Sequence, residues 1–191
     1  MSLTVRERYS GPAIVLHWLI AALIVGNLIG GLSFDYLPKS IFRPVLDAHK
    51  SFGLTILGLA IMRLLWRFVR QPPPMPAGYK PWEKKASHAM HWALYVMIFL
   101  VPLSGWAHDS AWKEAATHPI KLFWLIPFPR IGFIESMAPA SKESFHTLTA
   151  SVHQSLAYLI GAMVLVHLAG ALKHQFIDKE PELQRMGIGR F

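Results

Sequence analysis

Four long apolar stretches constrain the fold of this 191-residue chain more than any other feature of its sequence. They cover about residues 12–32, 44–69, 82–106 and 144–176, and a helix needs about 20 mostly apolar residues to cross a bilayer. Charged residues form only 16% of the chain, whereas soluble domains carry about 25%. The sequence therefore predicts an all-α fold, an integral membrane four-helix bundle that forms a single domain over residues 1–191.

The connections between the stretches support this division. The proline-rich run at 72–76 must end the second helix, because proline cannot continue one. The first stretch is too long for a signal peptide, contains His17 and Trp18, and precedes no A-x-A cleavage site. An outer loop covers about residues 107–143. Its apolar segment at 120–128 is too short to span, so we expect that segment to rest on the membrane surface.

The basic residues predict the orientation of the helices. Twelve of the nineteen Lys and Arg residues flank the stretches on one side of the membrane, namely Arg6, Arg8, Arg63, Arg67, Arg70, Lys80, Lys84, Lys85, Lys173, Lys179, Arg185 and Arg190. Because cytoplasmic loops carry an excess of these residues, we expect both termini to be cytoplasmic. The net charge of +8 therefore does not indicate a nucleic-acid partner, since the basic residues form no continuous stripe.

Cysteine is absent and histidine is abundant. The absence of cysteine excludes covalent c-type haem attachment, cysteine-ligated iron–sulfur clusters and disulfides. Histidine inside a membrane span is usually functional, and His153 and His167 lie 14 residues apart on the fourth stretch. At about 100° and 1.5 Å per residue, they point to nearly the same face and stand roughly 21 Å apart in depth. One of them therefore lies near each side of the hydrocarbon core.

Each of these histidines has a partner at its own depth. The first stretch enters from the cytoplasm, so His17 and His167 can meet in the inner half of the bilayer. The second and fourth stretches both begin on the outer side, so His49 and His153 can meet in the outer half. The sequence thus predicts two bis-histidine sites stacked across the membrane.

Haem is the ligand that suits such sites. Histidine is a standard axial ligand of haem iron, and helix bundles hold cofactors between facing helices. Zinc or copper would require further ligands, and no carboxylate lies inside a span at either level. Arg63 lies 14 residues after His49 and should face the inner site, where it could bind a haem propionate. Four glycines would either admit the macrocycle or serve helix packing; they are Gly53, Gly58, Gly161 and Gly170.

Short motifs in a fixed order extend over nearly the whole chain, from about residue 9 to 186. They are Leu16-His17-Trp18, His49-Lys50-Ser51-Phe52-Gly53, Arg63-Leu64-Leu65-Trp66-Arg67, His88 and His91 before Leu94-Tyr95, Pro102-Leu103-Ser104-Gly105-Trp106, His153, His167 and the tail from Lys173 to Lys179. No single motif is specific, but in order and spacing they resemble the bacterial cytochrome b561 family of dihaem, quinone-linked membrane proteins.

The resemblance implies that His17 and His167 bind one haem b and that His49 and His153 bind the other. It also implies a multi-pass protein of the bacterial inner membrane with ubiquinone as a partner. Some family members oxidise superoxide at the outer face and pass the electron to ubiquinone, whereas others relay electrons to partner proteins. The sequence departs from the family at Gln175, where many relatives have a second histidine beside the first.

Several histidines outside the two pairs are open to more than one interpretation. His174 and His91 are candidates for a quinone site. His88 and His91 could line the inner haem or carry protons, since histidine titrates near neutral pH, or they could be structural. We expect His108, His118 and His146 to be loop or interface residues.

Three functions remain in view. The leading one is electron transfer between an outer-side donor, such as superoxide, and the ubiquinone pool. Lys39, Arg43 and Lys50 would attract a small anion to the outer mouth, or would simply be solvated. The second is an electron-transfer subunit that docks a separate periplasmic or membrane redox protein through the long loop. The third, a proton or metal transporter, needs polar residues that the spans lack beyond the histidines and Asn27.

Overall fold

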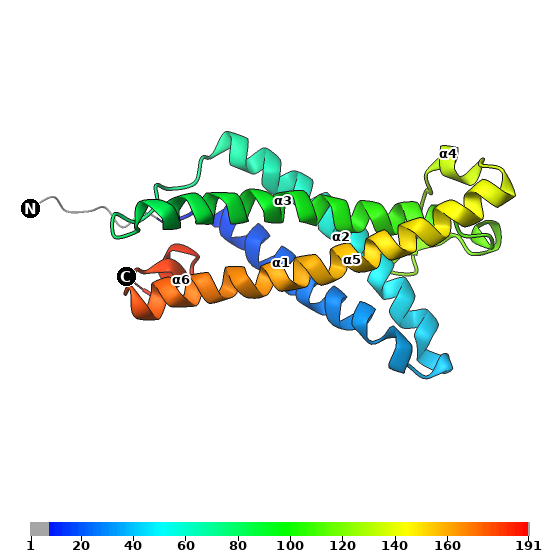
Figure 1. Cartoon of the computed structure of the whole chain (residues 1–191), viewed down its shortest axis with the longest axis horizontal. Helices are drawn as coiled ribbons and strands as arrows, with labels where there is room; N and C mark the ends of the chain where they lie inside the picture. The colour runs from blue at the N-terminus through cyan, green and yellow to red at the C-terminus, as the bar shows by residue number, and fades with distance from the viewer. Residues whose placement is uncertain (1–7, 191) are drawn as a thin grey trace, which may run out of the picture.

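Four long helices form the protein, of which a computed structural model describes residues 8–190. They are α1 (Gly11–Leu32), α2 (Lys39–Val69), α3 (Pro81–Ser110) and α5 (Pro139–Leu172), the last continued by a π-helical turn, η3 (Lys173–Ile177). All four are long and apolar enough to cross a membrane (Figure 1). The predicted number of spanning helices is therefore present in the described chain.

The helices are longer than the apolar stretches that predicted them. Helix α2 begins at Lys39 and places Pro44 inside the helix, although Pro44 was expected to start it. Helix α3 continues to Ser110 and α5 begins at Pro139, so the outer loop is confined to residues 111–138 instead of 107–143. The reason is that polar helical turns can project beyond the apolar part of a membrane, where they need no apolar surface.

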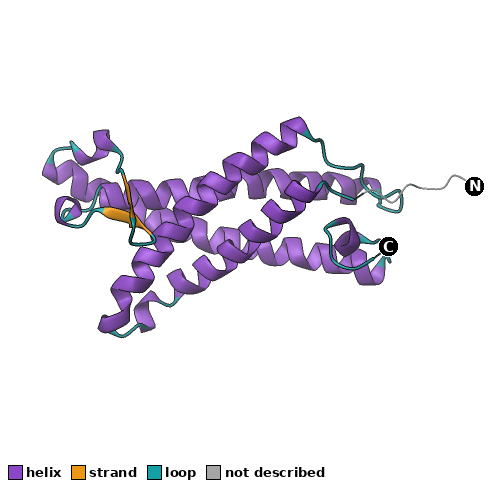
Figure 2. Cartoon of the chain, turned by 180° about the vertical axis from the view of Figure 1, so that it is seen from behind, coloured by secondary structure: helices purple, strands orange, loops and turns teal. Residues whose placement is uncertain are grey.

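The helices pack as two antiparallel pairs that cross. Helix α1 packs along α2 and α3 packs along α5, while α2 also contacts α3. Figure 1 shows the α1–α2 pair inclined to the α3–α5 pair, whose two helix axes are closely aligned. Figure 2 shows the same crossing from behind. The two histidines of the inner pair therefore come from different helix pairs, one from α1 and the other from α5.

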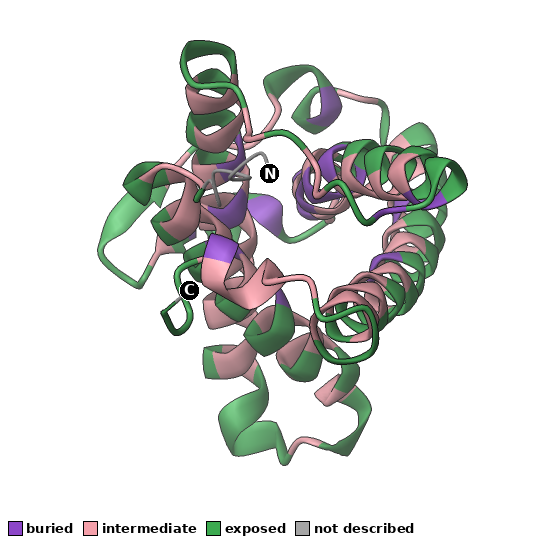
Figure 3. Cartoon of the chain, turned by 90° about the vertical axis from the view of Figure 1, so that its left-hand side faces the viewer, coloured by how far each residue is buried: buried purple, intermediate pink, exposed green. Residues whose placement is uncertain are grey.

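A small apolar core lies where the four helices cross. Its buried members include Ile24 from α1, Ile56 from α2, Ile98 from α3 and Ile160 from α5. Only 6% of the most apolar window of α1, and the same share for α5, is buried inside the chain. Figure 3, which looks along the bundle, shows few buried residues on the long helices, whose outward faces are largely exposed. The remaining apolar side chains need a lipid environment.

The outer loop contains a β-hairpin that was not predicted. Strands β1 (Ile120–Leu122) and β2 (Ile126–Phe128) pair antiparallel and form the only sheet in the described residues (Figure 2). The backbone N–H of Phe123 donates to Oγ of Ser51 at 2.9 Å, and the Phe123 ring contacts the ring of Phe52. The expectation of a segment resting on the membrane surface is therefore incomplete, because the hairpin is fixed against α2.

Short helical turns complete the connections. They are η1 (Phe34–Tyr36), η2 (Ala115–Thr117), α4 (Gly132–Glu135) and α6 (Glu182–Arg185). Helix α6 folds back, so that the N–H of Tyr9 donates to the carbonyl of Arg185 at 3.1 Å. Both ends of the described chain thus lie at one end of the bundle, here called the inner end, opposite the outer loop (Figure 1). Arg6, used for the orientation, falls outside the described residues, and a cytoplasmic inner end stays a prediction.

Candidate functional site

The structure brings together both predicted histidine pairs. The ring centres of His49 on α2 and His153 on α5 lie 6.0 Å apart, with their planes at 90°. The ring centres of His17 on α1 and His167 on α5 lie 6.2 Å apart, with their planes at 83°. Helix α5 therefore supplies one histidine to each pair, as its 14-residue spacing predicts.

Backbone carbonyls orient both imidazoles of the outer pair. Nδ1 of His49 donates to the carbonyl of Asn27 at 3.1 Å, and Nδ1 of His153 donates to the carbonyl of Val101 at 3.0 Å. Since a carbonyl only accepts, each Nδ1 carries the proton and each Nε2 keeps its lone pair. Ligating histidines characteristically use one ring nitrogen in this way and bind metal with the other.

Two glycines that the sequence did not assign to the haem sites, Gly31 and Gly105, pack against the outer pair. A Cβ atom at Gly31 would lie 3.1 Å from Cε1 of His49, and one at Gly105 would lie 3.0 Å from Cε1 of His153. The glycines that were singled out are less close to the histidines. Gly53 lines the outer cavity and Gly161 faces Leu28, but Cβ atoms at Gly58 and Gly170 would have no neighbour within 4 Å.

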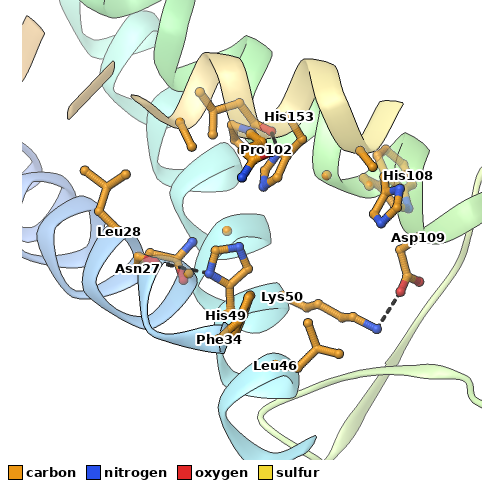
Figure 4. Close-up of a pocket in the computed structure, with 18 of the residues that line it drawn as sticks. Asn27, Leu28, Phe34, Leu46, His49, Lys50, Pro102, His108, Asp109 and His153 are labelled. Atoms are coloured by element: carbon orange, nitrogen blue, oxygen red, sulfur yellow. Dashed lines mark hydrogen bonds and ion pairs between the residues drawn. The ribbon is translucent and has the colours of Figure 1, made fainter. Parts of the chain in front are cut away.

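A cavity of about 690 Å³ lies beside the outer pair. His49 and His153 face each other across it in Figure 4, with Asn27 and Phe34 beside His49. Its volume is within the usual range for small-molecule and cofactor sites, roughly 300–1,000 Å³. All four spanning helices contribute to its lining, so the site depends on the complete bundle.

A buried ion network stands at the outer side of this cavity. Asp109 on α3 pairs with Nζ of Lys50 at 2.5 Å and with Nε of Arg130 at 2.9 Å. Arg130, whose side chain is 5% exposed, also donates to the carbonyls of Ala115 and His118, and so fixes the outer loop.

The three cations expected to attract an anion are not equally available. Lys50 pairs with Asp109, and Arg43 pairs with Asp47 at 3.8 Å. Lys39 is exposed at the start of α2. Asp47 offsets the charge of Arg43, and Lys50 shares Asp109 with Arg130, so the field at the outer mouth is weaker than the number of cations suggests.

His108 and His146 form a pair that the sequence analysis missed. Both were expected to be loop or interface residues, but they lie in α3 and α5 and line the outer cavity. Their rings stack with centres 4.0 Å apart and planes at 19°. The available signal was spacing, because His146 precedes His153 by seven residues, which is two helical turns. His118, by contrast, is exposed in the loop.

The inner pair has a third histidine beside it. The ring centre of His91 on α3 lies 5.3 Å from that of His167. Along the described chain, neither His17 nor His167 donates a ring nitrogen to a backbone carbonyl, unlike the outer pair. Arg63 donates to the carbonyl of Ala13 at 3.1 Å and lies over the Tyr95 ring. Its guanidinium therefore lies one turn of α1 from His17, with donors left for another partner.

His174 lies in a polar cluster at the inner end. Its Nδ1 is 2.6 Å from Oδ2 of Asp178, and its ring stacks on Tyr79 at 3.9 Å. Burial, followed by the nearby Glu182 carboxylate, raises the pKa of Tyr79, so that its hydroxyl stays protonated and donates to Glu182. His88 is exposed on α3. The structure thus places His91 beside the inner pair and His174 in the cluster that holds the C-terminal segment.

The geometry of both pairs suits a metal ion held between two imidazoles. With metal–nitrogen bonds of about 2 Å, two imidazoles on opposite sides of one ion have ring centres about 6 Å apart. Both pairs have this separation. His49 and His153 would hold a haem iron between them, and the cavity beside this pair has room for a planar macrocycle. The residues therefore fit a haem held by two histidines at the outer level, and the imidazoles of the inner pair have nearly the same separation.

Comparison with known proteins agrees with this chemistry. A family described as prokaryotic cytochrome b561 matches residues 8–189. Cytochrome b561 homolog 2 of Escherichia coli (strain K12) is 31% identical, over 94% of this chain and 91% of its own length. Cytochrome b562 of Cereibacter sphaeroides is 28% identical, over 96% of this chain and 98% of its own length. The Probable superoxide oxidase CybB of Yersinia pestis is 25% identical, over 94% of this chain and 96% of its own length.

The family match covers every residue of both histidine pairs. The match to the Escherichia coli protein extends over nearly the full length of both chains. Together with four helices of membrane-spanning length, this makes the chain a multi-pass bacterial membrane protein. The chain therefore belongs to the prokaryotic cytochrome b561 family, the b-type haem proteins that carry electrons in bacterial membranes.

Proposed function

We propose that this chain is a dihaem cytochrome of the bacterial inner membrane that passes electrons between an outer-side donor and ubiquinone. The observation that carries the proposal is the pair of facing histidines at each of two levels, with ring centres 6.0 and 6.2 Å apart. His49 and His153 would hold the outer haem b, and His17 and His167 the inner one. Haem iron supplies the one-electron chemistry, and the protein sets its depth and surroundings.

The crossing point of the helices supports electron transfer over transport. Ile24, Ile56, Ile98 and Ile160, one from each spanning helix, are buried between the outer and inner pairs. An apolar layer of this kind excludes water, so it offers no path for protons or hydrated metal ions between the two levels. Electrons need no such path. The transporter alternative therefore has no support at this layer.

At the inner end, several side chains suit the roles expected of them. Arg63 retains guanidinium donors for a propionate of the inner haem, because its one hydrogen bond within residues 8–190 is to the Ala13 carbonyl. His91, 5.3 Å from His167, is the better placed of the two quinone candidates. His174 is already engaged with Asp178 and Tyr79, which favours a structural role. We place the inner end, and both termini, in the cytoplasm.

Superoxide is the proposed donor because one relative is named a probable superoxide oxidase. Two superoxide ions would release two molecules of oxygen and two electrons, which together with two protons reduce one ubiquinone to ubiquinol. Electrons would enter at the outer cavity, whose mouth carries Arg43 and Lys50. Their carboxylate partners predict only a modest salt dependence of the rate.

The second candidate is a subunit that receives electrons from a separate redox protein. It is favoured by the exposed apolar side chains of the outer loop, chiefly Leu125 and Phe133. A partner that must be present before quinone is reduced would support this candidate. Fast quinone reduction by superoxide with the isolated protein would exclude it.

The first test is the haem content of the protein purified in mild detergent. A reduced-minus-oxidised spectrum of b type, with close to two haems per chain by the pyridine haemochrome assay, is expected. His49→Ala and His17→Ala should each leave one haem, and the two remaining haems should differ in spectrum or potential. A wild-type protein that holds no haem despite ample supply would overturn the proposal.

A further inference from the structure

The outer cavity has two chemically different ends. Its deep end is apolar, since Ile24, Ile56, Ile98 and Ile160 all line it. Its outer side is polar and includes Lys50, Asp109 and His108 (Figure 4), together with His146, whose ring stacks on that of His108. A planar ligand with one apolar edge and one charged edge would therefore bind in a single orientation.

The stacked histidines line this cavity, and each holds only one of its ring nitrogens in a hydrogen bond within the described residues. Nδ1 of His108 donates to the carbonyl of His146 at 3.1 Å, and Nδ1 of His146 donates to the carbonyl of His108 at 3.0 Å. These reciprocal bonds hold each ring by one nitrogen. Within the described residues Nε2 of either ring has no hydrogen-bond partner, so both Nε2 atoms are available to a ligand.

The position of the stack relative to the outer pair is set by helix α5. His146 precedes His153 by seven residues, which rotates it by only about 20° from the same face and places it about 10 Å toward the outer end. The stack therefore stands on the ligand-bearing face of α5, between the outer pair and the outer surface. Lys50 follows His49 directly in the sequence. Its charge is partly offset by Asp109, which it shares with Arg130.

We propose that His108 and His146 bind the propionate carboxylates of the outer haem, an inference that rests on the proposed function. A haem has an apolar edge and an edge with two carboxylates, which matches the two ends of the cavity. Because each Nδ1–H donates to a carbonyl, only Nε2 can bind a carboxylate, and one proton lies between the two groups. Either the imidazolium donates to the carboxylate or the carboxylic acid donates to the imidazole. The stack thus orients the outer haem and lowers the charge beside its iron.

The test is a redox titration of the full-length protein, depleted of haem and reloaded either with haem b or with haem b dimethyl ester. His108→Leu and His146→Leu would leave a propionate charge uncompensated, which favours ferric over ferrous iron. With haem b, we expect the oxidised-to-reduced ratio of one haem, at a fixed ambient potential, to rise on the order of tenfold, as for one charge-assisted hydrogen bond. With the ester, which has no carboxylate charge, we expect no change.

Three controls make the result decisive. The His17→Ala background, which should keep only the outer haem, assigns the shifted signal. His118→Leu removes a loop histidine outside the cavity and should shift neither haem. His146→Gln keeps a hydrogen-bond donor, so its oxidised-to-reduced ratio should be close to that of the wild type. This variant can also be measured if a leucine variant does not retain its haem.

An equal shift with haem b and with the ester would overturn the proposal, and so would no shift with haem b. The first result would mean that the stack acts through packing or binds a soluble anion. Either result, in protein with two haems per chain, leaves the proposed function standing. Protein without haem would instead remove the proposed function itself.

Discussion

The outer pair, His49 and His153, and the inner pair, His17 and His167, have nearly equal ring separations but different surroundings. At the outer level, backbone carbonyls of other helices fix both imidazoles, and glycines at 31 and 105 allow close packing around them. At the inner level, neither imidazole donates to a backbone carbonyl of the described residues, and the rings of Trp18 and His91 lie beside the pair.

The two sites would therefore bind their cofactors in different ways. The outer imidazoles are oriented by the fold itself, so the cofactor meets a preformed site. Near the inner site, the two ends of the described chain contact each other. Nε1 of Trp18 donates to the carbonyl of Met186, and the N–H of Tyr9 donates to the carbonyl of Arg185. The outer site should therefore respond to changes within the bundle and the outer loop, and the inner site to changes in the C-terminal segment.

The largest effect should come from removing the carboxylate of Asp109. Asp109→Ala leaves Lys50 and Arg130 without their partner, and breaking a buried ion pair typically costs about 3–5 kcal/mol. We expect the outer haem to dissociate at a markedly lower temperature, while the inner haem is retained. Site-resolved absorbance during a thermal ramp measures this.

The matched control for Asp109→Ala is Asp47→Ala. Asp47 pairs with Arg43 over one exposed helical turn at 3.8 Å, and such surface pairs contribute only about 0.3–0.5 kcal/mol. If both variants release the outer haem at the same temperature, the buried network does not support the outer site.

A smaller effect, still confined to the outer level, is expected from a methyl group beside His153. In Gly105→Ala the new Cβ would lie 3.0 Å from Cε1 of an imidazole that hydrogen bonds already hold. Overpacking of this kind costs about 1–3 kcal/mol, which corresponds to roughly 5- to 150-fold weaker retention of the outer haem. Haem transfer to apomyoglobin would measure the release rate. Gly170→Ala, whose Cβ meets no neighbour within 4 Å, should leave both haems unchanged.

A smaller effect at the opposite level is expected from Trp18→Phe. The substitution removes the 2.8 Å hydrogen bond to the carbonyl of Met186 and keeps an aromatic ring beside His17. One such bond contributes about 0.5–1.5 kcal/mol. We expect faster hydrogen exchange in the C-terminal segment and a small change in the inner haem alone. A change in the outer haem would contradict the independence of the two sites.

The smallest effect is a pH dependence of the inner end. A hydrogen bond from Lys173, and a weaker one from His174, hold the pKa of Asp178 below its ordinary value of 3.8. Because the folded pKa is depressed, the stabilisation is fully present above the ordinary value and is lost as the pH falls through the folded value. Proteolysis of the C-terminal segment should therefore accelerate below about pH 4. Asp178→Asn should remove this acid dependence, whereas an unchanged profile would assign it to another group.

Much of the site was predictable because helices are periodic. The 14-residue spacing of His153 and His167 determines their shared face and separate depths, and the direction of each span then selects His49 and His17 as partners. The same arithmetic would have found His146, two turns before His153, but its partner on α3 could not be identified in this way. His108 lies near the end of a helix that was expected to stop at residue 106.

Other features depend on contacts that no periodicity describes. The hairpin on α2 requires Phe123 and Trp124 to adopt positive φ angles of 49° and 64°, which non-glycine residues rarely do. It is held by Ser51, to which the motif at 49–53 gives no role in the outer loop. The closeness of Gly31 to His49 and of Gly105 to His153 likewise depends on how each helix is rotated about its axis.

The sequence by itself determined that four apolar helices cross a membrane and that their histidines fall at two depths. These conclusions depend on composition, length and the pitch of a helix, which neighbouring elements do not alter. Three sets of contacts are visible only in the folded chain. They are the carbonyls that orient the outer imidazoles, the ion pairs of Asp109 with Lys50 and Arg130, and the stacking of His108 on His146. Those contacts are set by helix rotation, crossing and loop docking, and each depends on the whole bundle being packed at once.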